Sequence, residues 1–141
     1  MIRNIIDQLK RDEGVRAAAY QDHLGYWTIG VGRLIDDRRG GGLRPDEIEL
    51  LLANDVADRT KALVQALPWF SRLDGARQGV LLNMAFQMGT AGLLGFRNTL
   101  ALVAAGKYVE AATQMLQSEW AKQTPARANR LAEQMKTGEW K

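Results

Sequence analysis

The sequence contains no cysteine and a single histidine, His23. Without cysteine the chain has no disulfide framework, no thiol nucleophile and no thiolate ligand for a metal. One imidazole by itself does not make a histidine-ligated metal site. These two observations argue against a cysteine- or histidine-ligated metal site. We expect a protein that works without a metal ion or an organic cofactor.

Long apolar runs are also missing. Charged side chains interrupt the first segment, MIRNIIDQLKRDEG, so it lacks the apolar core of a secretory signal. No later segment approaches the roughly 20 apolar residues that span a membrane. The sequence therefore predicts synthesis in the cytoplasm and no stable insertion into a membrane.

The overall composition is that of one globular domain. Of the 141 residues, 46% are hydrophobic and 25% are charged, and a chain of this length can bury a sizeable core. The formal net charge of +3 is spread along the chain. This charge is compatible with an anionic partner, such as nucleic acid, anionic lipid or an anionic cell-wall polymer. It is equally well explained by solubility alone, without any partner.

The chain up to Gly42 carries the signals of one helix and a very small sheet. Apolar residues recur at helical spacing near the start: Ile2, Ile5, Ile6 and Leu9. Gly14 is placed to end this helix. The segments AAAYQ and YWTIGVGRL, joined by the turn DHLG, predict two short antiparallel strands, and the glycine-rich segment from Asp36 to Gly42 is typical of a loop.

Two long helices are predicted next. One begins at Pro45 and ends before Pro68, because proline suits the first helical position and cannot continue a helix. Its inward stripe consists of Ile48, Leu51, Leu52, Val56, Leu63 and Leu67. The other runs from Asp74, an N-cap, to Gly89, and its apolar middle VLLNMAFQM is typical of a central buried helix.

The remaining chain is also expected to be helical. Three further helices are expected: around Thr99 to Ala105, around Tyr108 to Gln117, and from Pro125 to near Gly138 with Thr124 as N-cap. The predicted fold class is α+β and predominantly α. A small β lobe covers about residues 14–44, and a helical lobe covers about residues 45–141 plus the N-terminal helix.

Two acidic residues, Glu13 and Asp22, are predicted to lie in unlike surroundings. Glu13 follows Leu9 by four residues, so it continues the apolar stripe toward the core at the negative end of the helix dipole. Both effects favour its protonated form, whereas Asp22 lies in a wetter turn that favours an ionised carboxylate. Glycoside hydrolysis needs this combination, and the hydroxyl of Thr28 could hold a water molecule.

An alternative interpretation assigns these acids no chemistry. Glu13 is then an ion-paired structural acid and Asp22 an ordinary turn residue. Acids in such positions are often only paired, so the residue pattern alone favours this alternative.

Two other polar groups allow more than one interpretation. Asn83 and Gln87 lie four residues apart on the central helix, where they either satisfy each other and the backbone or line a cleft. The basic residues near Arg127 could contact a membrane or nucleic acid, but Glu133 and Glu139 interrupt them, which favours a solvated helix face.

Six motifs are spaced along the whole chain: DEGVR, YQDHLGYWTIGVG, NDV, NMAFQMG, GFRNTL and WAKQTPARANR. In this order they resemble those of the phage-type lysozymes of glycoside hydrolase family 24. The resemblance implies a lysozyme-like fold with an active-site cleft between the two lobes. It also implies that Glu13 is the general acid, that Asp22 positions or activates water, and that Thr28 assists Asp22.

The resemblance extends to supporting residues. Arg127 matches the arginine that pairs with the catalytic glutamate, and this pair would favour the ionised form of Glu13, against the two effects above. Four positions match saccharide contacts of the family: Leu34, Phe86, Thr99 and Gln114. The last two differ in residue type from the family representative but remain polar.

The chain also departs from the T-even phage members of the family. It is much shorter between Arg33 and Pro45, so part of the small lobe's sheet and its loops must be missing. Arg33 replaces a histidine that pairs with an aspartate matched here by Asp55. We expect an Arg33–Asp55 pair whose pH dependence comes only from the aspartate.

The function implied by the resemblance is that of an endolysin. Such a bacteriolytic muramidase hydrolyses the β-1,4 bond between N-acetylmuramic acid and N-acetylglucosamine in peptidoglycan, usually with inversion, which needs carboxyls about 6.5–9.5 Å apart. We expect a monomer without nucleic-acid partners, held in the host cytoplasm until a phage holin opens a path to the wall. The alternatives are a lytic transglycosylase acting on the same bond, and a non-catalytic wall-binding or membrane-disrupting module.

Overall fold

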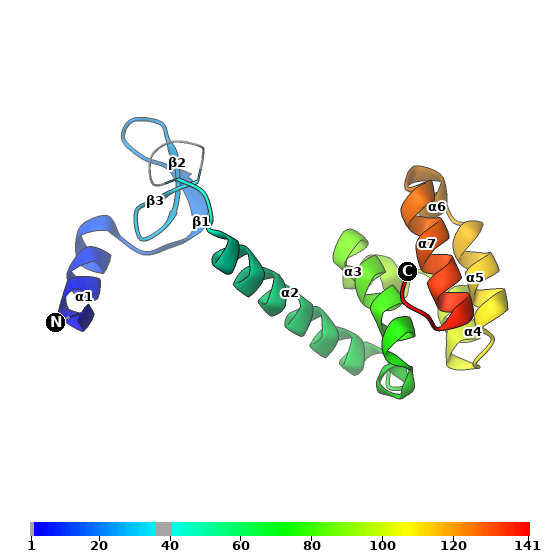
Figure 1. Ribbon diagram of the computed structural model, residues 1–141. Coiled ribbons are helices and arrows are strands. Elements are labelled where there is room, and N and C mark those ends of the chain that lie inside the picture. Colours follow the sequence, from blue (N-terminus) through cyan, green and yellow to red (C-terminus); the bar gives the residue numbers. More distant parts are fainter. Residues whose placement is uncertain (1, 36–40) are drawn as a thin grey trace. The chain divides into compact units, whose positions relative to one another are not determined.

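The computed structural model describes residues 2–35 and 41–141, with side chains from residue 6 onward (Figure 1). Over these residues it contains seven α-helices, one short 3-10 helix and three strands. The predicted fold class, α+β and predominantly α, is confirmed. Most of the predicted loop from Asp36 to Gly42 lies outside the described residues.

The chain forms two compact units, Met1–Leu51 and Leu52–Lys141. The first contains α1, the sheet and the start of α2, and the second contains the rest of α2 and all later helices. The lobe boundaries expected from the sequence, about 14–44 and 45–141, stay a prediction.

Helix α1 (Ile2–Glu13) ends where the sequence predicts. Gly14 has a φ of 79°, and its amide donates to the carbonyl of Lys10 at 3.0 Å. Glycine adopts this left-handed conformation without the steric penalty of a side chain. Glu13 is therefore the last helical residue, directly before the sheet.

The sheet has three strands, one more than predicted. β1 (Arg16–Gln21), β2 (Trp27–Gly30) and β3 (Arg33–Leu34) pair antiparallel in the order β1-β2-β3. The prediction joined β2 and β3 into one strand, but the chain turns at Gly30 and Gly32, which both have a φ of 68°. A positive φ interrupts an extended strand, so this pair of glycines divides the segment.

Thr28 occupies the centre of this sheet. It lies opposite Tyr20 on β1 and opposite Leu34 on β3. It is 3% exposed and is the only buried residue among the side chains described in the first unit. Backbone pairing on both sides and burial together fix its position.

The burial of α1 differs from the prediction. Ile6 and Leu9 are 45% and 43% exposed, and Glu13 is exposed as well. Within the first unit, therefore, Glu13 does not face a core. A unit made of one short helix and three short strands has too little apolar surface to enclose this stripe.

The long helix α2 (Pro45–Ala66) begins at the predicted proline. The carboxylate of Glu47 accepts from the amide of Arg44 at 2.8 Å, as the third helical residue does in a capping box. Of the predicted inward stripe, Leu63 and Leu67 are buried at 0% and 8% exposure. Four earlier residues of the stripe are 40–51% exposed: Ile48, Leu51, Leu52 and Val56. Neither unit by itself buries these four residues, because helical spacing identifies an apolar face but not what covers it.

The second unit is built around α3 (Gly75–Leu94), which contains the predicted central helix. Its other helices are α4 (Arg97–Ala104), α5 (Tyr108–Leu116), α6 (Glu119–Gln123) and α7 (Pro125–Thr137), with a 3-10 turn at Phe70–Arg72. In Figure 1, α4 to α7 are the yellow to red helices, and α7 packs against α3, α5 and α6. Helix α6 was not predicted, since five residues are too few to show a helical period.

Helix α3 supplies much of the core of this unit. Val80, Leu81, Met84 and Ala85 are all 0% exposed. A kink interrupts the helix at Gly89, where φ is 82° and ψ is 159°, so the predicted stop is present within the longer element.

Over the described residues no single helix has the length and apolar composition to cross a membrane. Helices α3 and α4 meet these criteria only when they are taken together, and they are bent by 101° relative to each other.

Asp74 caps α3 as predicted. Its carboxylate accepts from the backbone amide of Arg77 at 3.1 Å and from the guanidinium at 3.0 Å. Burial acts to raise the pKa of Asp74, but the amide and guanidinium of Arg77 outweigh it, so the net pKa is lowered.

The start of α7 matches the prediction in position but not in mechanism. Pro125 is the first helical residue, and Thr124 occupies the N-cap position without a capping hydrogen bond. The hydroxyl of Thr124 instead donates to the carbonyl of Trp120 at 3.0 Å, so it closes the end of α6. At the other end, Gly138 has a φ of 73° and ends α7 as predicted.

Candidate active site

Asp22 is fixed by the turn between β1 and β2. Its Oδ1 accepts hydrogen bonds from the backbone amides of Leu24 and Tyr26 at 2.9 and 2.8 Å. The amide of Gly25 closes the turn by donating to the carbonyl of Asp22 at 2.9 Å. Both side-chain bonds end on Oδ1, so the carboxylate is oriented while Oδ2 receives neither of them.

The backbone of Tyr26 joins Asp22 to Thr28. Its amide donates to the Asp22 carboxylate, and its carbonyl accepts from the amide of Asp22 at 2.8 Å and from the hydroxyl of Thr28 at 3.0 Å. One residue of main chain thus sets the positions of two predicted catalytic side chains. Their catalytic roles stay a prediction.

Glu13 lies at the end of α1, and its carboxyl group approaches the turn between β2 and β3. A Cβ atom built on Gly32 would lie 2.8 Å from Oε2 and 3.0 Å from Cδ of Glu13. The carboxyl therefore packs against the Gly32 backbone at a place where a side chain would collide with it. All three predicted catalytic residues belong to the first unit.

Arg33 pairs with Glu47 in the structure. Its guanidinium donates to the Glu47 carboxylate and to the carbonyl of Gly42, the latter at 3.4 Å, and so joins β3 to the first turn of α2. The pKa of Glu47 is lowered, first by the hydrogen bond from Arg33 and next by the amide of Arg44. The Arg33–Asp55 pair stays a prediction, since Asp55 belongs to the second unit.

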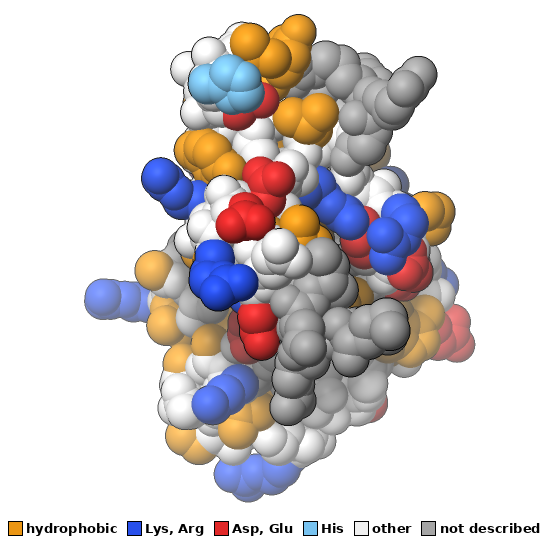
Figure 2. All heavy atoms as spheres, turned by 90° about the vertical axis from the view of Figure 1, so that its left-hand side faces the viewer, with side chains coloured by type: hydrophobic (Ala, Val, Ile, Leu, Met, Phe, Trp, Pro, Cys, Tyr) orange, Lys and Arg blue, Asp and Glu red, His pale blue; other side chains and the backbone are white. Residues whose placement is uncertain are grey.

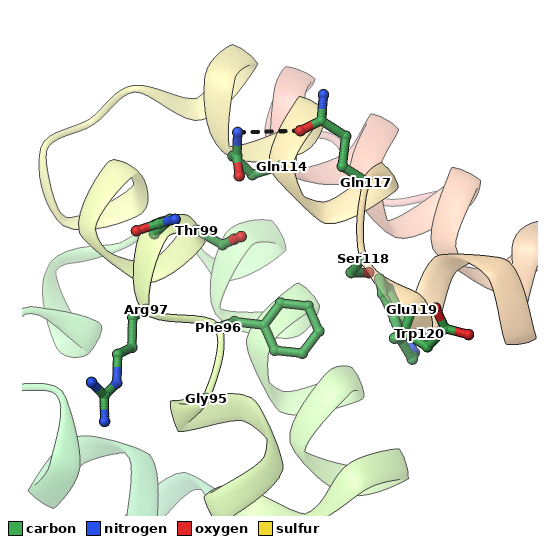
Figure 3. Close-up of a pocket in the computed structure, with 10 residues that line it drawn as sticks. Gly95, Phe96, Arg97, Thr99, Gln114, Gln117, Ser118, Glu119 and Trp120 are labelled. Carbon is green, nitrogen blue, oxygen red and sulfur yellow. Dashed lines mark hydrogen bonds between the residues drawn. The ribbon is translucent and has the colours of Figure 1, made fainter.

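Two of the four predicted saccharide contacts share a pocket in the second unit. This pocket of about 510 Å³ is lined by both Thr99 and Gln114 (Figure 3). Thr99 is 4% exposed, and the amide of Gln114 donates to Gln117 at 3.4 Å. The full lining consists of Gly95, Phe96, Arg97, Asn98, Thr99, Gln114, Gln117, Ser118, Glu119 and Trp120.

Two aromatic side chains form one side of this pocket. Figure 3 shows the ring of Phe96 directed toward Trp120; the ring centroids are 6.2 Å apart in an edge-to-face arrangement. The indole of Trp120 donates to Gln87 at 2.9 Å, so one end of the ring is anchored. The pocket therefore combines amide and hydroxyl groups with apolar ring surface, which suits the two faces of a sugar.

Arg127 and Phe86 line a second hollow, of about 330 Å³, together with Asn83. Arg127 donates to the side-chain oxygen of Asn83 at 2.8 Å and to its backbone carbonyl at 3.3 Å. Asn83 is thus bound by Arg127 and Gln87 by Trp120, which answers how the two polar residues of α3 are satisfied. The predicted pair between Arg127 and Glu13 stays a prediction, because these residues belong to different units.

Leu34, the fourth predicted saccharide contact, lies on β3 beside Thr28. It is half-buried, whereas Phe86 is 43% exposed. Leu34 belongs to the first unit, and the three other predicted contacts belong to the second.

Figure 2 shows acidic and basic side chains interspersed with exposed hydrophobic ones on the face that it displays.

Several residues at these sites were missed by sequence reasoning. Glu47 shows a recognisable signal, because it is an acid at the third helical position after Pro45. The role of Tyr26 lies in its backbone, so its side-chain type gives no signal. Gln117 and Asn98 line the pocket through the packing of α4 and α5, which sequence spacing does not describe.

Comparison with known proteins places the chain in one family. Residues 10–136 match the family model for phage lysozyme. The chain is 34% identical over 165 aligned positions to a probable T4-type lysozyme 1 of Dictyostelium discoideum, covering 98% of this chain and 96% of that protein. A probable T4-type lysozyme 2 of the same organism is 29% identical over the same shares of both chains.

A third relative is a larger protein. The pre-baseplate central spike protein Gp5 of Enterobacteria phage T4 is 31% identical over 96% of this chain but only 28% of its own length. The matched region spans nearly the whole of the present chain in each comparison. The protein belongs to the phage lysozyme family.

Proposed function

We propose that this protein is a muramidase that hydrolyses the β-1,4 bond between N-acetylmuramic acid and N-acetylglucosamine. Membership of the phage lysozyme family supports a peptidoglycan-lytic glycosidase. The observation that carries the finer proposal is the pairing of Asp22 and Thr28 through Tyr26 in the same unit as Glu13. A proton donor and an oriented carboxylate are the two groups that the reaction requires.

In the proposed reaction, Glu13 donates its proton to the glycosidic oxygen as the bond from that oxygen to C1 breaks. Asp22 accepts a proton from a water molecule whose oxygen attacks C1 on the opposite face of the sugar. Oδ2 of Asp22 is the oxygen proposed for this water, because both backbone hydrogen bonds end on Oδ1. The product has an inverted configuration, and the two carboxyl groups exchange their proton with solvent.

The hydroxyl of Thr28 is proposed to help position the attacking water. It is a donor to Tyr26 in the structure, so an oxygen lone pair can accept a hydrogen bond from water. Saccharide units are proposed to lie against Leu34 and Phe86 and in the pocket that contains Thr99 and Gln114. The aromatic and amide groups of that pocket support this assignment.

The biological setting belongs to the same proposal. We propose a monomeric endolysin that is held in the host cytoplasm and reaches the wall through a holin pore. The second unit contains 11 Lys and Arg against 7 Asp and Glu, and this excess favours approach to an anionic wall polymer. Expression in a bacterial host should cause lysis only when a holin is expressed as well; lysis without any holin would contradict this route.

Mass spectrometry of fragments released from purified peptidoglycan tests the proposed reaction. The wild-type protein should release fragments with reducing-end muramic acid, and Glu13→Gln should release essentially none. Asp12→Asn is the matched control, because it neutralises the adjacent exposed acid of the same helix. The anomeric configuration of the first product, followed by proton NMR, distinguishes inversion from retention.

The other outcomes identify the alternatives. Anhydro-muramic products would make the protein a lytic transglycosylase, which can work with one acid and needs neither Asp22 nor Thr28. Wall release that persists in Glu13→Gln would show that Glu13 is not the proton donor. No release by either protein would contradict the muramidase proposal and favour a wall-binding or membrane-disrupting module.

A further inference from the structure

Within the first unit, the Glu13 carboxyl occupies the space that a side chain at position 32 would fill. A Cβ atom at Gly32 would lie 2.8 Å from Oε2, 3.0 Å from Cδ and 3.3 Å from Cγ of Glu13. These distances are shorter than the ordinary van der Waals separation of about 3.5–4.0 Å between carbon atoms. Any residue other than glycine at position 32 must therefore displace either the carboxyl group or the backbone.

The carboxyl group is the part that is free to move. It is the end of a flexible, exposed side chain on the last residue of α1. The backbone around Gly32 is held by the pairing of β2 with β3, in which Thr28 lies opposite Leu34 and Ile29 opposite Arg33. A methyl group at position 32 should thus leave the sheet in place and push the carboxyl away.

We propose that Gly32 is a positioning residue for the general acid: its missing side chain leaves open the space that the Glu13 carboxyl occupies for proton transfer. This inference rests on the proposed function, because it assumes that Glu13 donates the proton. It gives Gly32 a role in addition to its backbone conformation. The turn between β2 and β3 then sets the location of the acid, while the turn between β1 and β2 sets that of Asp22.

Gly30 provides a matched control for the backbone effect. Gly30 and Gly32 have the same φ of 68°, so an alanine at either position meets the same kind of conformational strain. A Cβ atom at Gly30 would have no atom within 4 Å, in contrast to the contact with Glu13 at Gly32. The difference between Gly30→Ala and Gly32→Ala therefore reports the displacement of the carboxyl.

The first measurement is the activity of both variants on purified peptidoglycan. Each should be assayed at a temperature at which its circular dichroism equals that of the wild type, so that both are folded. We expect kcat of Gly32→Ala to fall about 100-fold further than that of Gly30→Ala, because a misplacement of about 1 Å has an effect of that size. KM should stay similar in the two variants, and the pH profile of kcat should shift only in Gly32→Ala.

A shorter acid gives a second, independent readout. Glu13→Asp withdraws the carboxyl by one methylene and removes the collision with a methyl group at position 32. In a protein that already carries Glu13→Asp, adding Gly32→Ala should therefore lower kcat no more than adding Gly30→Ala does. The melting temperatures of the two single glycine variants should fall by similar amounts.

The outcomes separate this inference from the proposed function. Equal loss of kcat in Gly30→Ala and Gly32→Ala would overturn the positioning role, even if Glu13→Gln is inactive. An additional loss that persists unchanged in Glu13→Asp would also overturn it, because the effect would not pass through the carboxyl. Wild-type activity in Glu13→Gln would instead overturn the proposed function itself.

Discussion

The two units of this protein hold their functional side chains by different means. In Met1–Leu51, Thr28 is the only buried residue among the side chains described, and Asp22 is oriented by backbone amides of its turn. In Leu52–Lys141, a continuous apolar core underlies the pocket that contains Thr99 and Gln114. Local hydrogen bonds thus orient Asp22 and Thr28, whereas packing of the helices supports the pocket that contains Thr99 and Gln114.

The units also differ in charge. The first has 8 Lys and Arg against 9 Asp and Glu, a net charge of −1, and the second has 11 against 7, a net charge of +4. The positive excess, although spread along the sequence, therefore belongs to the helical unit. The first unit, which contains the proposed catalytic acids, has no positive excess with which to attract an anionic wall polymer. The second unit has such an excess and can attract the polymer instead.

The largest expected effect tests the difference in burial, with two leucines of the same helix. Leu63 is 0% exposed in the second unit, and Leu50 is 61% exposed in the first. Leu63→Ala should lower the free energy of unfolding by about 2–5 kcal/mol, because it leaves a cavity in the core. Leu50→Ala should change it by about 0.5 kcal/mol or less.

Urea unfolding followed by far-UV circular dichroism measures both leucine variants. Both replace leucine by alanine in α2, so helix propensity changes equally and cancels in the comparison. Equal destabilisation would contradict the contrast, because it would mean that Leu50 is as well packed as Leu63.

A smaller effect is expected at the Asp22 turn. Asp22→Ala removes the acceptor for two backbone amides and should destabilise the turn by about 1–3 kcal/mol, whereas Asp22→Asn retains a side-chain oxygen and should be much milder. Hydrogen exchange of the Leu24 and Tyr26 amides measures this difference. Both variants should lose activity under the proposed function; an active Asp22→Asn variant would contradict a catalytic carboxylate there.

The smallest effect concerns the ion pair between Arg33 and Glu47. Because the pKa of Glu47 is lowered in the folded state, the ionised carboxylate contributes to stability at pH values above its ordinary pKa of 4.5. The contribution is lost as the pH falls through the lower folded-state pKa. Glu47→Gln should therefore lower the stability of the folded protein near neutral pH. The stability of this variant should also fall less than that of the wild type as the pH is lowered.

Thermal unfolding across a pH series measures the effect of Glu47→Gln. Glu49→Gln is the control, since it removes an exposed acid from the same helix. If the melting temperature falls equally with pH in the wild type and in Glu47→Gln, the Arg33–Glu47 pair does not stabilise the connection between β3 and α2.

Element boundaries set by local chemistry were predicted well. Gly14 ends α1, Pro45 begins α2, Asp74 caps α3 and Gly138 ends α7. Each signal depends on the backbone conformation or hydrogen bonding of one or two residues, so it is readable without knowledge of the rest of the fold. The six family motifs likewise identified the family from sequence alone.

Side-chain partners were predicted less well. Thr124 lies at the expected cap position, but its hydroxyl turns back to Trp120. Arg33 binds Glu47, a partner 14 residues away that the sequence analysis did not name, while the Arg33–Asp55 pair stays a prediction. A hydroxyl or guanidinium can reach several acceptors, and the choice depends on which of them the fold brings near.

The sequence by itself determined the family, the order of the longer helices and the identities of the candidate acids, because these depend on residue type and spacing. The tertiary structure decided that Asp22 and Thr28 meet at the backbone of Tyr26 and that the Glu13 carboxyl lies against Gly32. It also decided that Leu63 is buried while Ile48 of the same stripe is exposed. Periodicity specifies which side of an element is apolar, but only the packing of other elements determines whether that side is covered.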